Sequence, residues 1–307
     1  PGWPAHKIFF QLALEHADSS PLTVGAEHWA EQFPAPDIFH LQQRPARLLL
    51  DPCQGVLAGE VGYGDMLELP GNKIMVWSVH IRGPQSAHVW NLQTGEIDTE
   101  LEGHPSWILG AVLVSDEHML SWSASRLLLS ELDNLNEPVA LETGGSIYGV
   151  TVLDAQRAVS FGDNGVILWD LPTQTIRQHW LADQTISPVV HADDQLLAGT
   201  RDGFRPGERS GVFHRISIPS GSIQSTPELD EWAKGGLILS EDILLCWAKN
   251  FMFLWNPDTG GFNELPHASE VGGAICLSDG RLLSWQSGAW GPTSVLDAST
   301  KSQPTAP

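Results

Sequence analysis

The chain has 307 residues, of which 42% are hydrophobic and 17% are charged. This much apolar material excludes a mainly disordered protein, and the length suits either two domains or one large all-β domain. The chain holds 16 Lys and Arg against 37 Asp and Glu, which gives a formal net charge of −21. Binding to the phosphates of nucleic acid or to an anionic membrane needs the opposite charge, so neither partner is expected.

Targeting and cofactor signals are not recognisable in the sequence. No apolar run reaches the roughly 18 residues of a transmembrane helix, and no signal-peptide pattern opens the chain. The cysteines Cys53, Cys246 and Cys276 are too few and too widely spaced for a disulfide framework or a zinc cluster, so we expect reduced core residues. We therefore expect a cytoplasmic protein without metal or cofactor, and a place within a longer multidomain chain is a further expectation.

The N-terminal segment, residues 1–36, differs in pattern from everything that follows it. KIFFQLALEHA at 7–17 has apolar residues at helical spacing and predicts a short helix. A second, weaker helix pattern runs across 22–32, with a proline at its start. We therefore predict an N-terminal helical segment over 1–36, followed by a β-propeller domain over 37–307.

From residue 47 onward one pattern recurs: an apolar run ends in a large residue, and a polar residue and a turn follow. The copies read RLLLDPCQG at 47–55, HVWNLQTGE at 88–96, LLLSELDNL at 127–135, VILWDLPTQ at 166–174, VFHRISIPSG at 212–221, MFLWNPDTGG at 252–261 and TSVLDAST at 293–300. Corresponding positions lie 39 to 47 residues apart. A period of about 40 residues is typical of propeller blades.

A second strand-length apolar string precedes most copies of the first. Its copies are KIMVWSV at 73–79, HMLSWSA at 118–124, RAVSFGD at 157–163, QLLAGTR at 195–201, ILLCWAK at 243–249 and RLLSWQS at 281–287. Shorter segments before and after complete four strands per unit. One four-stranded sheet cannot cover its own faces, whereas a ring of sheets buries each face against a neighbour. The fold class is therefore predicted as all-β, a β-propeller of about 40-residue four-stranded blades.

Tryptophans recur at fixed places in the two strings. Those of the second string are Trp77, Trp122, Trp247 and Trp285, and those of the first are Trp90, Trp169 and Trp255. Because these are strand positions and not loop positions, we predict that the rings pack between blades and do not form a ligand-binding aromatic cage.

The repeat resembles the WD-repeat β-propeller family, over residues from about 46 to 300. The likeness is clearest in SFGDNGVILWDL at 160–171, which has an Asp-containing tight turn at Asp163 and the dipeptide Trp169-Asp170. Trp90 and Trp255 are each followed by Asn instead of Asp, and Gly103-His104 is the single Gly-His pair. In that family His, Asp, Ser or Thr, and Trp form a hydrogen-bonded network within a blade, and no blade here has all four.

By this resemblance, Trp90, Asp163, Trp169, Asp170 and Trp255 are expected to be structural residues of the repeat. The resemblance also implies a rigid, non-catalytic platform for protein interactions.

The repeat count favours seven blades, with a terminal blade that combines N-terminal and C-terminal material. The first copy has DIFHLQQ at 37–43 as its candidate second strand, but no convincing first strand comes before it. Six blades is therefore the alternative.

Three links between the second and third strands are long: 79–87, 201–211 and 287–294. In a propeller these links emerge on one face, together with the connections between successive blades, and extended loops on a rigid scaffold commonly carry recognition. That face would present Arg82, His104, Arg201, Arg205, Arg209 and Trp290. Arg and Trp are enriched in interaction hot spots, which predicts an acidic protein or peptide partner there. The alternative is that the arginines pair locally with Asp and Glu.

Two functions from different classes remain open at this point. The first is a non-catalytic scaffold or sensor module that presents a recognition face built from loops. The second is a propeller-type hydrolase or lyase with its active site at the central channel, although no phosphate-binding, nucleophile-elbow, zincin or EF-hand motif is found in the sequence.

Overall fold

The computed structural model describes residues 28, 64–78, 87–201, 210–265, 270–277, 280–286 and 294–296. The chain divides into two compact units, Pro1–Gly59 and Glu60–Pro307. In the first unit the structure describes His28, which is helical and exposed. The helix predicted at 7–17 and the domain boundary predicted at residue 37 lie outside the described residues.

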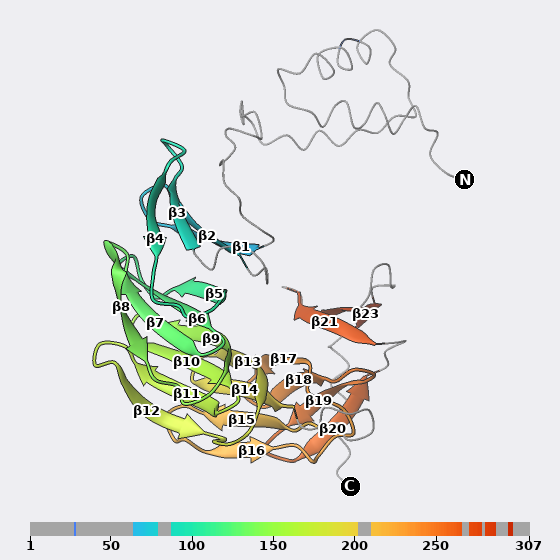
Figure 1. Cartoon of the computed structure of the whole chain (residues 1–307). Helices are drawn as coiled ribbons and strands as arrows, with labels where there is room; N and C mark the ends of the chain where they lie inside the picture. The colour runs from blue at the N-terminus through green and yellow to red at the C-terminus, as the bar shows by residue number, and fades with distance from the viewer. Residues whose placement is uncertain are drawn as a thin grey trace. The chain divides into compact units, whose positions relative to one another are not determined.

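The second unit contains antiparallel sheets that are each a meander in chain order (Figure 1). The first three sheets are β1 (Gly64–Leu69), β2 (Lys73–Ser78), β3 (Ala87–Asn91) and β4 (Ile97–Leu101); β5 (Ile108–Leu113), β6 (His118–Ser123), β7 (Arg126–Glu131) and β8 (Asn134–Leu141); and β9 (Ile147–Asp154), β10 (Arg157–Gly162), β11 (Gly165–Asp170) and β12 (Thr175–Trp180). The next three are β13 (Ile186–Ala192), β14 (Gln195–Thr200), β15 (Phe213–Ser217) and β16 (Ile223–Ser225); β17 (Gly235–Ser240), β18 (Ile243–Trp247), β19 (Met252–Asn256) and β20 (Gly261–Leu265); and β21 (Val271–Cys276), β22 (Leu282–Gln286) and β23 (Ser294–Leu296).

The strands follow the two repeated strings of the sequence. The second string forms the second strand of every described sheet, from β2 to β22, and the first string forms the third strand, from β3 to β23. The described residues thus hold five four-stranded sheets and one three-stranded sheet, and the predicted all-β fold of the β-propeller class is confirmed. The copy at 47–55, on which the seventh blade was predicted, lies outside the described residues.

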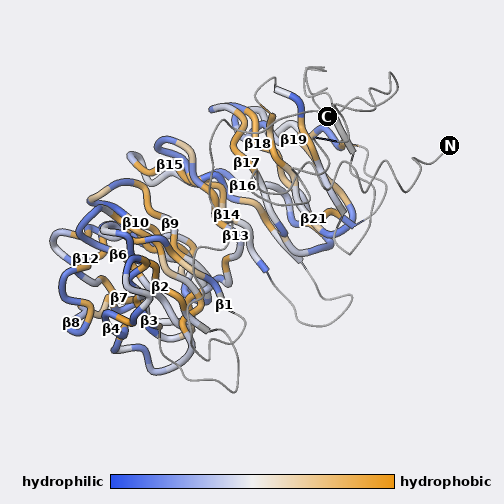
Figure 2. The backbone as a smooth tube through the Cα atoms, turned by 90° about the horizontal axis from the view of Figure 1, so that it is seen from above, coloured by the Kyte–Doolittle hydropathy of each residue, from blue (hydrophilic) through white to orange (hydrophobic). Residues whose placement is uncertain are grey.

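Buried apolar clusters join each sheet to the next. One cluster contains Met75 of β2 and Ile108 of β5, and another contains Leu127 of β7 and Ala158 of β10. Three further clusters join the third sheet to the fourth, the fourth to the fifth and the fifth to the sixth. The first strands of successive sheets, β1, β5, β9, β13, β17 and β21, contact one another in that order. Figure 2 shows the result along the chain, with hydrophobic strands separated by hydrophilic turns.

Most of the repeat tryptophans lie in these clusters, as predicted. Trp77, Trp247, Trp90, Trp169 and Trp255 are buried. Trp122 is half-buried against the cluster that joins the second and third sheets. Trp285 is 40% exposed, so its predicted burial is wrong. Its sheet, β21–β23, has one described neighbouring sheet, β17–β20. A blade needs a neighbour on each side to bury the side chains of both its faces.

The aromatic residue of the second strand packs on a glycine of the first strand in four sheets. The pairs are Gly110 with Trp122, Gly149 with Phe161, Gly235 with Trp247, and Gly273 with Trp285. A Cβ atom at any of these glycines would lie 2.1 to 2.4 Å from the ring, a distance that side chains do not tolerate. The glycines therefore make room for the rings, and the burial of Trp247 depends on this close approach.

The turns of each sheet divide between two edges. Turns between the first and second strands lie beside turns between the third and fourth, as the hydrogen bonds from Leu132 N to Glu117 O and from Leu171 N to Gln156 O show. We call this edge of the sheets the turn face. The other edge holds the turns between the second and third strands and the links between sheets, joined for example by the bond from Ile147 N to Ala124 O. We call it the link face.

The cysteines differ in exposure. Cys246 is a free thiol in the core, whereas Cys276 on β21 is free and exposed, so the predicted core position is wrong for Cys276. Cys276 ends β21, where its neighbour Ile275 is exposed too, so both sides of the strand are uncovered at this end. Cys53 lies outside the described residues.

Candidate functional site

The predicted recognition residues belong to the link face, and the structure describes two of them. His104 lies in the link between β4 and β5, and Arg201 directly follows β14. Arg82, Arg205, Arg209 and Trp290 lie outside the described residues, so their place in a recognition face stays a prediction.

His104 is committed to contacts within its own sheet. Its Nε2 atom lies 2.8 Å from the hydroxyl oxygen of Ser121, and Arg126 donates a hydrogen bond of 2.8 Å to the carbonyl of Gly103. Burial, and to a lesser extent the Arg126 charge, lowers the pKa of His104 to about 4. The imidazole is therefore neutral at physiological pH and holds the link against the sheet; it does not present a charge to a partner.

Of the residues expected to be structural, Trp90, Trp169, Asp170 and Trp255 lie on third strands, and Asp163 lies in the turn between β10 and β11. Trp169 Nε1 donates a buried hydrogen bond of 2.9 Å to the hydroxyl of Ser160. Asp170, at the turn face, accepts bonds from the Thr173 backbone and from Arg177, at 3.1 and 2.6 Å. The hydrogen-bonded pairs His104–Ser121 and Trp169–Ser160 thus occupy neighbouring sheets.

Arg201 is exposed, yet two contacts fix its position. Its backbone nitrogen donates to the carbonyl of Thr185 at 3.0 Å. Its guanidinium carbon lies 4.6 Å from the centre of the Trp232 ring, in a cation–π arrangement. Trp232 belongs to the link between β16 and β17, so the contact joins two successive sheets.

Tyr148 and Asp163 lie next to this pair, in the third sheet. Tyr148 on β9 is 44% exposed, and its hydroxyl donates a hydrogen bond of 2.5 Å to Asp163. Thr185 donates a longer bond of 3.5 Å to the same carboxylate oxygen. Because Thr185 also accepts from the Arg201 backbone, these contacts connect Tyr148 to Arg201. We call Tyr148, Asp163, Thr185, Arg201 and Trp232 together the Arg201 site.

Two groups of the site, Tyr148 and Asp163, have pKa values shifted further from 7. The hydrogen bond to Asp163, followed by burial and the Asp163 charge, raises the pKa of Tyr148, and the Arg201 charge opposes that rise. Hydrogen bonds from the side chains of Tyr148 and Ser146 hold the pKa of Asp163 below its usual value. The phenol thus keeps its proton and the carboxylate stays ionised, so neither group is poised for proton transfer near pH 7.

Sequence reasoning placed Arg201 on the recognition face but missed Tyr148 and Trp232. The repeat itself contains a signal for Tyr148. In two sheets the residue directly before the first-strand glycine is exposed: Leu109 before Gly110, and Tyr148 before Gly149. Trp232 lies in a link without a repeated pattern, and nothing in the sequence connects it with Arg201.

The two faces differ in how their cations are paired. On the turn face, the ion pairs are Lys73–Asp98, Arg157–Asp154, Arg157–Asp194, Arg177–Asp170 and Arg215–Asp258. On the link face, Lys234 pairs with Glu270, whereas Arg126, Arg201 and Lys249 form no ion pair with another described residue. The alternative expected local Asp or Glu partners for the arginines of the long links; of these the structure describes Arg201, which has no ion pair with another described residue.

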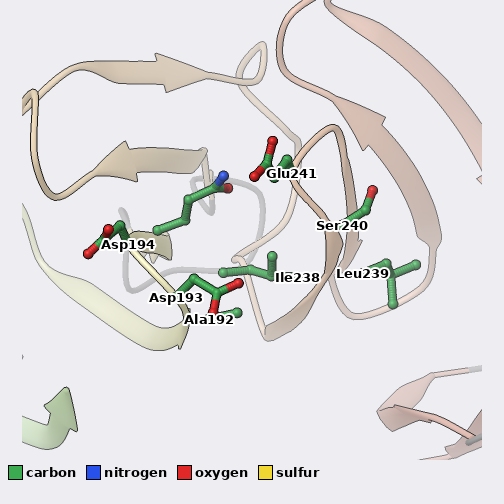
Figure 3. A pocket seen from close by; sticks show the side chains of 8 residues that line it. Ala192, Asp193, Asp194, Ile238, Leu239, Ser240 and Glu241 are labelled. Carbon is green, nitrogen blue, oxygen red and sulfur yellow. The ribbon is translucent and has the colours of Figure 1, made fainter. Parts of the chain in front are cut away.

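A cleft of about 230 Å³ opens on the turn face between the fourth and fifth sheets (Figure 3). Its lining residues come from the β13–β14 turn and from the end of β17 with the turn after it: Ala192, Asp193, Asp194, Gln195, Ile238, Leu239, Ser240 and Glu241. The three carboxylates make the cleft acidic. Within the described part of the chain, no three His, Cys, Asp or Glu side chains come together in a way suited to holding a metal ion.

The described residues contain no helix that is long and apolar enough to cross a membrane.

Comparisons with known proteins give structural likenesses and no sequence family. No protein-family model and no curated protein matches the chain. The crystal structure of the computationally designed Ika8 protein is similar with a TM-score of 0.56 and 17% identity, over 75% of this chain and 69% of that chain. The WD40 β-propeller domain of Doa1 gives a TM-score of 0.47 and 11% identity, over 69% of this chain and 71% of that chain. At such identity the likeness to the designed protein concerns the fold alone, and the meander sheets packed in succession are those of an all-β, propeller-type fold.

Proposed function

We propose that this chain is a non-catalytic interaction module, a scaffold or sensor, that binds a protein or peptide partner through its link face. The degenerate WD-type repeat of the sequence supports a propeller of that kind, and rigid sheets with exposed links suit recognition. The cytoplasm is the location we propose, in line with the free thiols of Cys246 and Cys276.

The observation that carries this proposal is the unequal pairing of cations on the two faces. In a chain with 37 acidic and 16 basic residues, a cation near the surface readily meets a carboxylate. Arg126, Arg201 and Lys249 nevertheless form no ion pair among the described residues, although the turn-face cations named above do. Cations that have no ion pair among the described residues and are held on a rigid edge can bind an acidic partner.

The shifted pKa values of four described groups, His104, His214, Tyr148 and Asp163, give no support to the enzyme alternative. A general acid or base works best with a pKa near the operating pH. Burial lowers the pKa of His104 and of His214 to about 4, and the Tyr148–Asp163 pair is shifted away from neutrality at both members. These shifts favour structural roles for the groups.

Affinity capture from a cell lysate tests the proposal. The intact chain is compared with a link-face variant, R201Q/K249Q, and with a variant in which Arg82, Arg205, Arg209 and Trp290 are replaced by Ala. The matched control is K73Q on the turn face, whose exposed ion pair with Asp98 contributes little to stability. We expect a partner that the intact chain and K73Q retain and that R201Q/K249Q loses. Equal capture by all variants would contradict a link-face interaction.

A further inference from the structure

We infer that the Arg201 site binds a peptide through the carboxylate of an Asp or Glu side chain, with a neighbouring apolar side chain of the peptide on Tyr148. This inference rests on the proposed interaction function and names the chemistry of the partner. It concerns one position of the link face, between the third, fourth and fifth sheets.

Arg201 supplies the cation. Its guanidinium carbon lies 4.6 Å from the centre of the Trp232 ring, and this contact restricts the side chain, so less side-chain entropy is lost when a ligand binds. In a cation–π contact the N–H groups at the edge of a guanidinium can still form two parallel hydrogen bonds to a carboxylate. No described carboxylate occupies that edge.

Asp163 is the acid among the residues of the site, and its carboxylate already has hydrogen-bond donors. Its carboxylate accepts hydrogen bonds from the side chains of Tyr148, Ser146 and Thr185. These three hydroxyl donors stabilise its charge without Arg201. A ligand carboxylate therefore does not have to displace Asp163 from the guanidinium.

Tyr148 supplies the apolar contact. Its hydroxyl donates to Asp163, so the part of this residue left for a ligand is the ring; Tyr148 as a whole is 44% exposed. Leu109, 42% exposed, occupies the corresponding position of β5, and β5 contacts β9. Both exposed side chains thus come from first strands that contact each other, and an apolar residue beside the ligand's carboxylate would bury part of this apolar surface.

The shape of the surface favours a peptide over a small molecule. The hollow in the third sheet next to the site, lined by residues such as Ser146, Gly162 and Asn164, measures about 10 Å³. That is about the space that a single water molecule needs. A ligand therefore lies across the surface, and an extended peptide can place a carboxylate on Arg201 and an apolar side chain on Tyr148 together.

The test uses a capped synthetic peptide, acetyl-Gly-Phe-Glu-Phe-Gly-amide, with acetyl-Gly-Phe-Gln-Phe-Gly-amide as the matched uncharged control. Binding to the full chain is followed by NMR on protein with ¹⁵N-labelled tryptophan, and W232F assigns the Trp232 indole signal. We expect the Glu peptide to shift this signal and to bind about tenfold more tightly than the Gln peptide, because a charged hydrogen bond is replaced by a neutral one. R201Q is expected to remove the difference, and R201K to retain part of it.

Several results would overturn the inference: equal affinity for the two peptides, a difference that survives R201Q, or binding only to a peptide with a free C-terminal carboxylate, acetyl-Gly-Phe-Phe. A well-dispersed indole spectrum of R201Q shows that the variant folds. If the peptides fail while R201Q/K249Q still loses its captured partner, the link-face interaction stands and this ligand chemistry is wrong. If capture is also unaffected, both proposals fail.

Discussion

The indole nitrogen of Trp169 and the hydroxyl of Ser160 form a hydrogen bond of 2.9 Å in the interior of the third sheet, and both side chains are buried. Trp169 lies on β11 and Ser160 on the neighbouring strand β10. An indole N–H that is buried without an acceptor costs the full desolvation of a polar group. The hydroxyl of Ser160 therefore removes this cost for the buried Trp169 side chain.

Replacing Ser160 with Ala is expected to lower the free energy of unfolding by about 1–3 kcal/mol, because the Trp169 N–H loses its acceptor. Urea unfolding followed by tryptophan fluorescence measures the change. S130A is the matched control, since Ser130 occupies the place of Trp169 in the second sheet and its buried hydroxyl has no hydrogen-bond partner. S130A should be neutral or stabilising; an equal loss in both variants would show that the hydrogen bond is not the cause.

In the first sheet a hydrogen-bond acceptor can be added instead of removed. Trp90 Nε1 is buried without a hydrogen-bond partner, and Val76 occupies the place that Ser160 has in the third sheet. Replacing Val76 with Thr keeps the branched shape and adds an acceptor, so we expect stability to rise by up to about 1 kcal/mol. V89T serves as control, because Val89 is buried and the added hydroxyl there should destabilise. A loss of stability in V76T as large as that in V89T would contradict this account.

Gly110 is expected to tolerate no side chain while Trp122 is present. A Cβ at Gly110 would lie 2.2 Å from the Trp122 ring, so G110A should destabilise by about 1–3 kcal/mol through overpacking. In a W122L background the same substitution should cost less. A double-mutant cycle measured by thermal unfolding gives the coupling, and a coupling of zero would show that the ring is not what excludes the methyl group.

Stability should fall as the pH drops from about 6.5 to about 4. The folded-state pKa values of His104 and His214 are about 4, lowered from 6.5 mainly by burial. Between these two values the unfolded chain binds more protons than the folded chain, so acidification favours unfolding. The contribution is fully present above pH 6.5 and is lost as the pH falls through 4.

Urea unfolding at several pH values tests this dependence, and H104N/H214N should flatten the slope between pH 6.5 and 4. Carboxylates with lowered pKa values, such as Asp163 and Asp170, act in a different range, because their contribution is lost below their usual pKa of 3.8. A slope between pH 6.5 and 4 that persists in the double variant would show that other groups cause it.

The repeat alone determined the sheets of this protein. The string SFGDNGVILWDL forms the hairpin of β10 and β11, whose turn uses Gly165 at a φ of +73°. Strand alternation, turn residues and a period near 40 can be recognised in the sequence without knowing which sheets pack against each other. For the same reason the residues that cover each sheet, such as Trp169 and Trp255, could be predicted as core.

Only the tertiary structure decided which side chains meet across sheets. Arg201 and Trp232 lie in different links, and their contact depends on the packing of the fourth sheet against the fifth. Trp285 occupies the same repeat position as Trp247 but is exposed, because burial depends on the sheets on both sides and not on the strand itself. Local pattern thus specified the blades of this protein, and the Arg201 site exists because long-range packing brings three of them together.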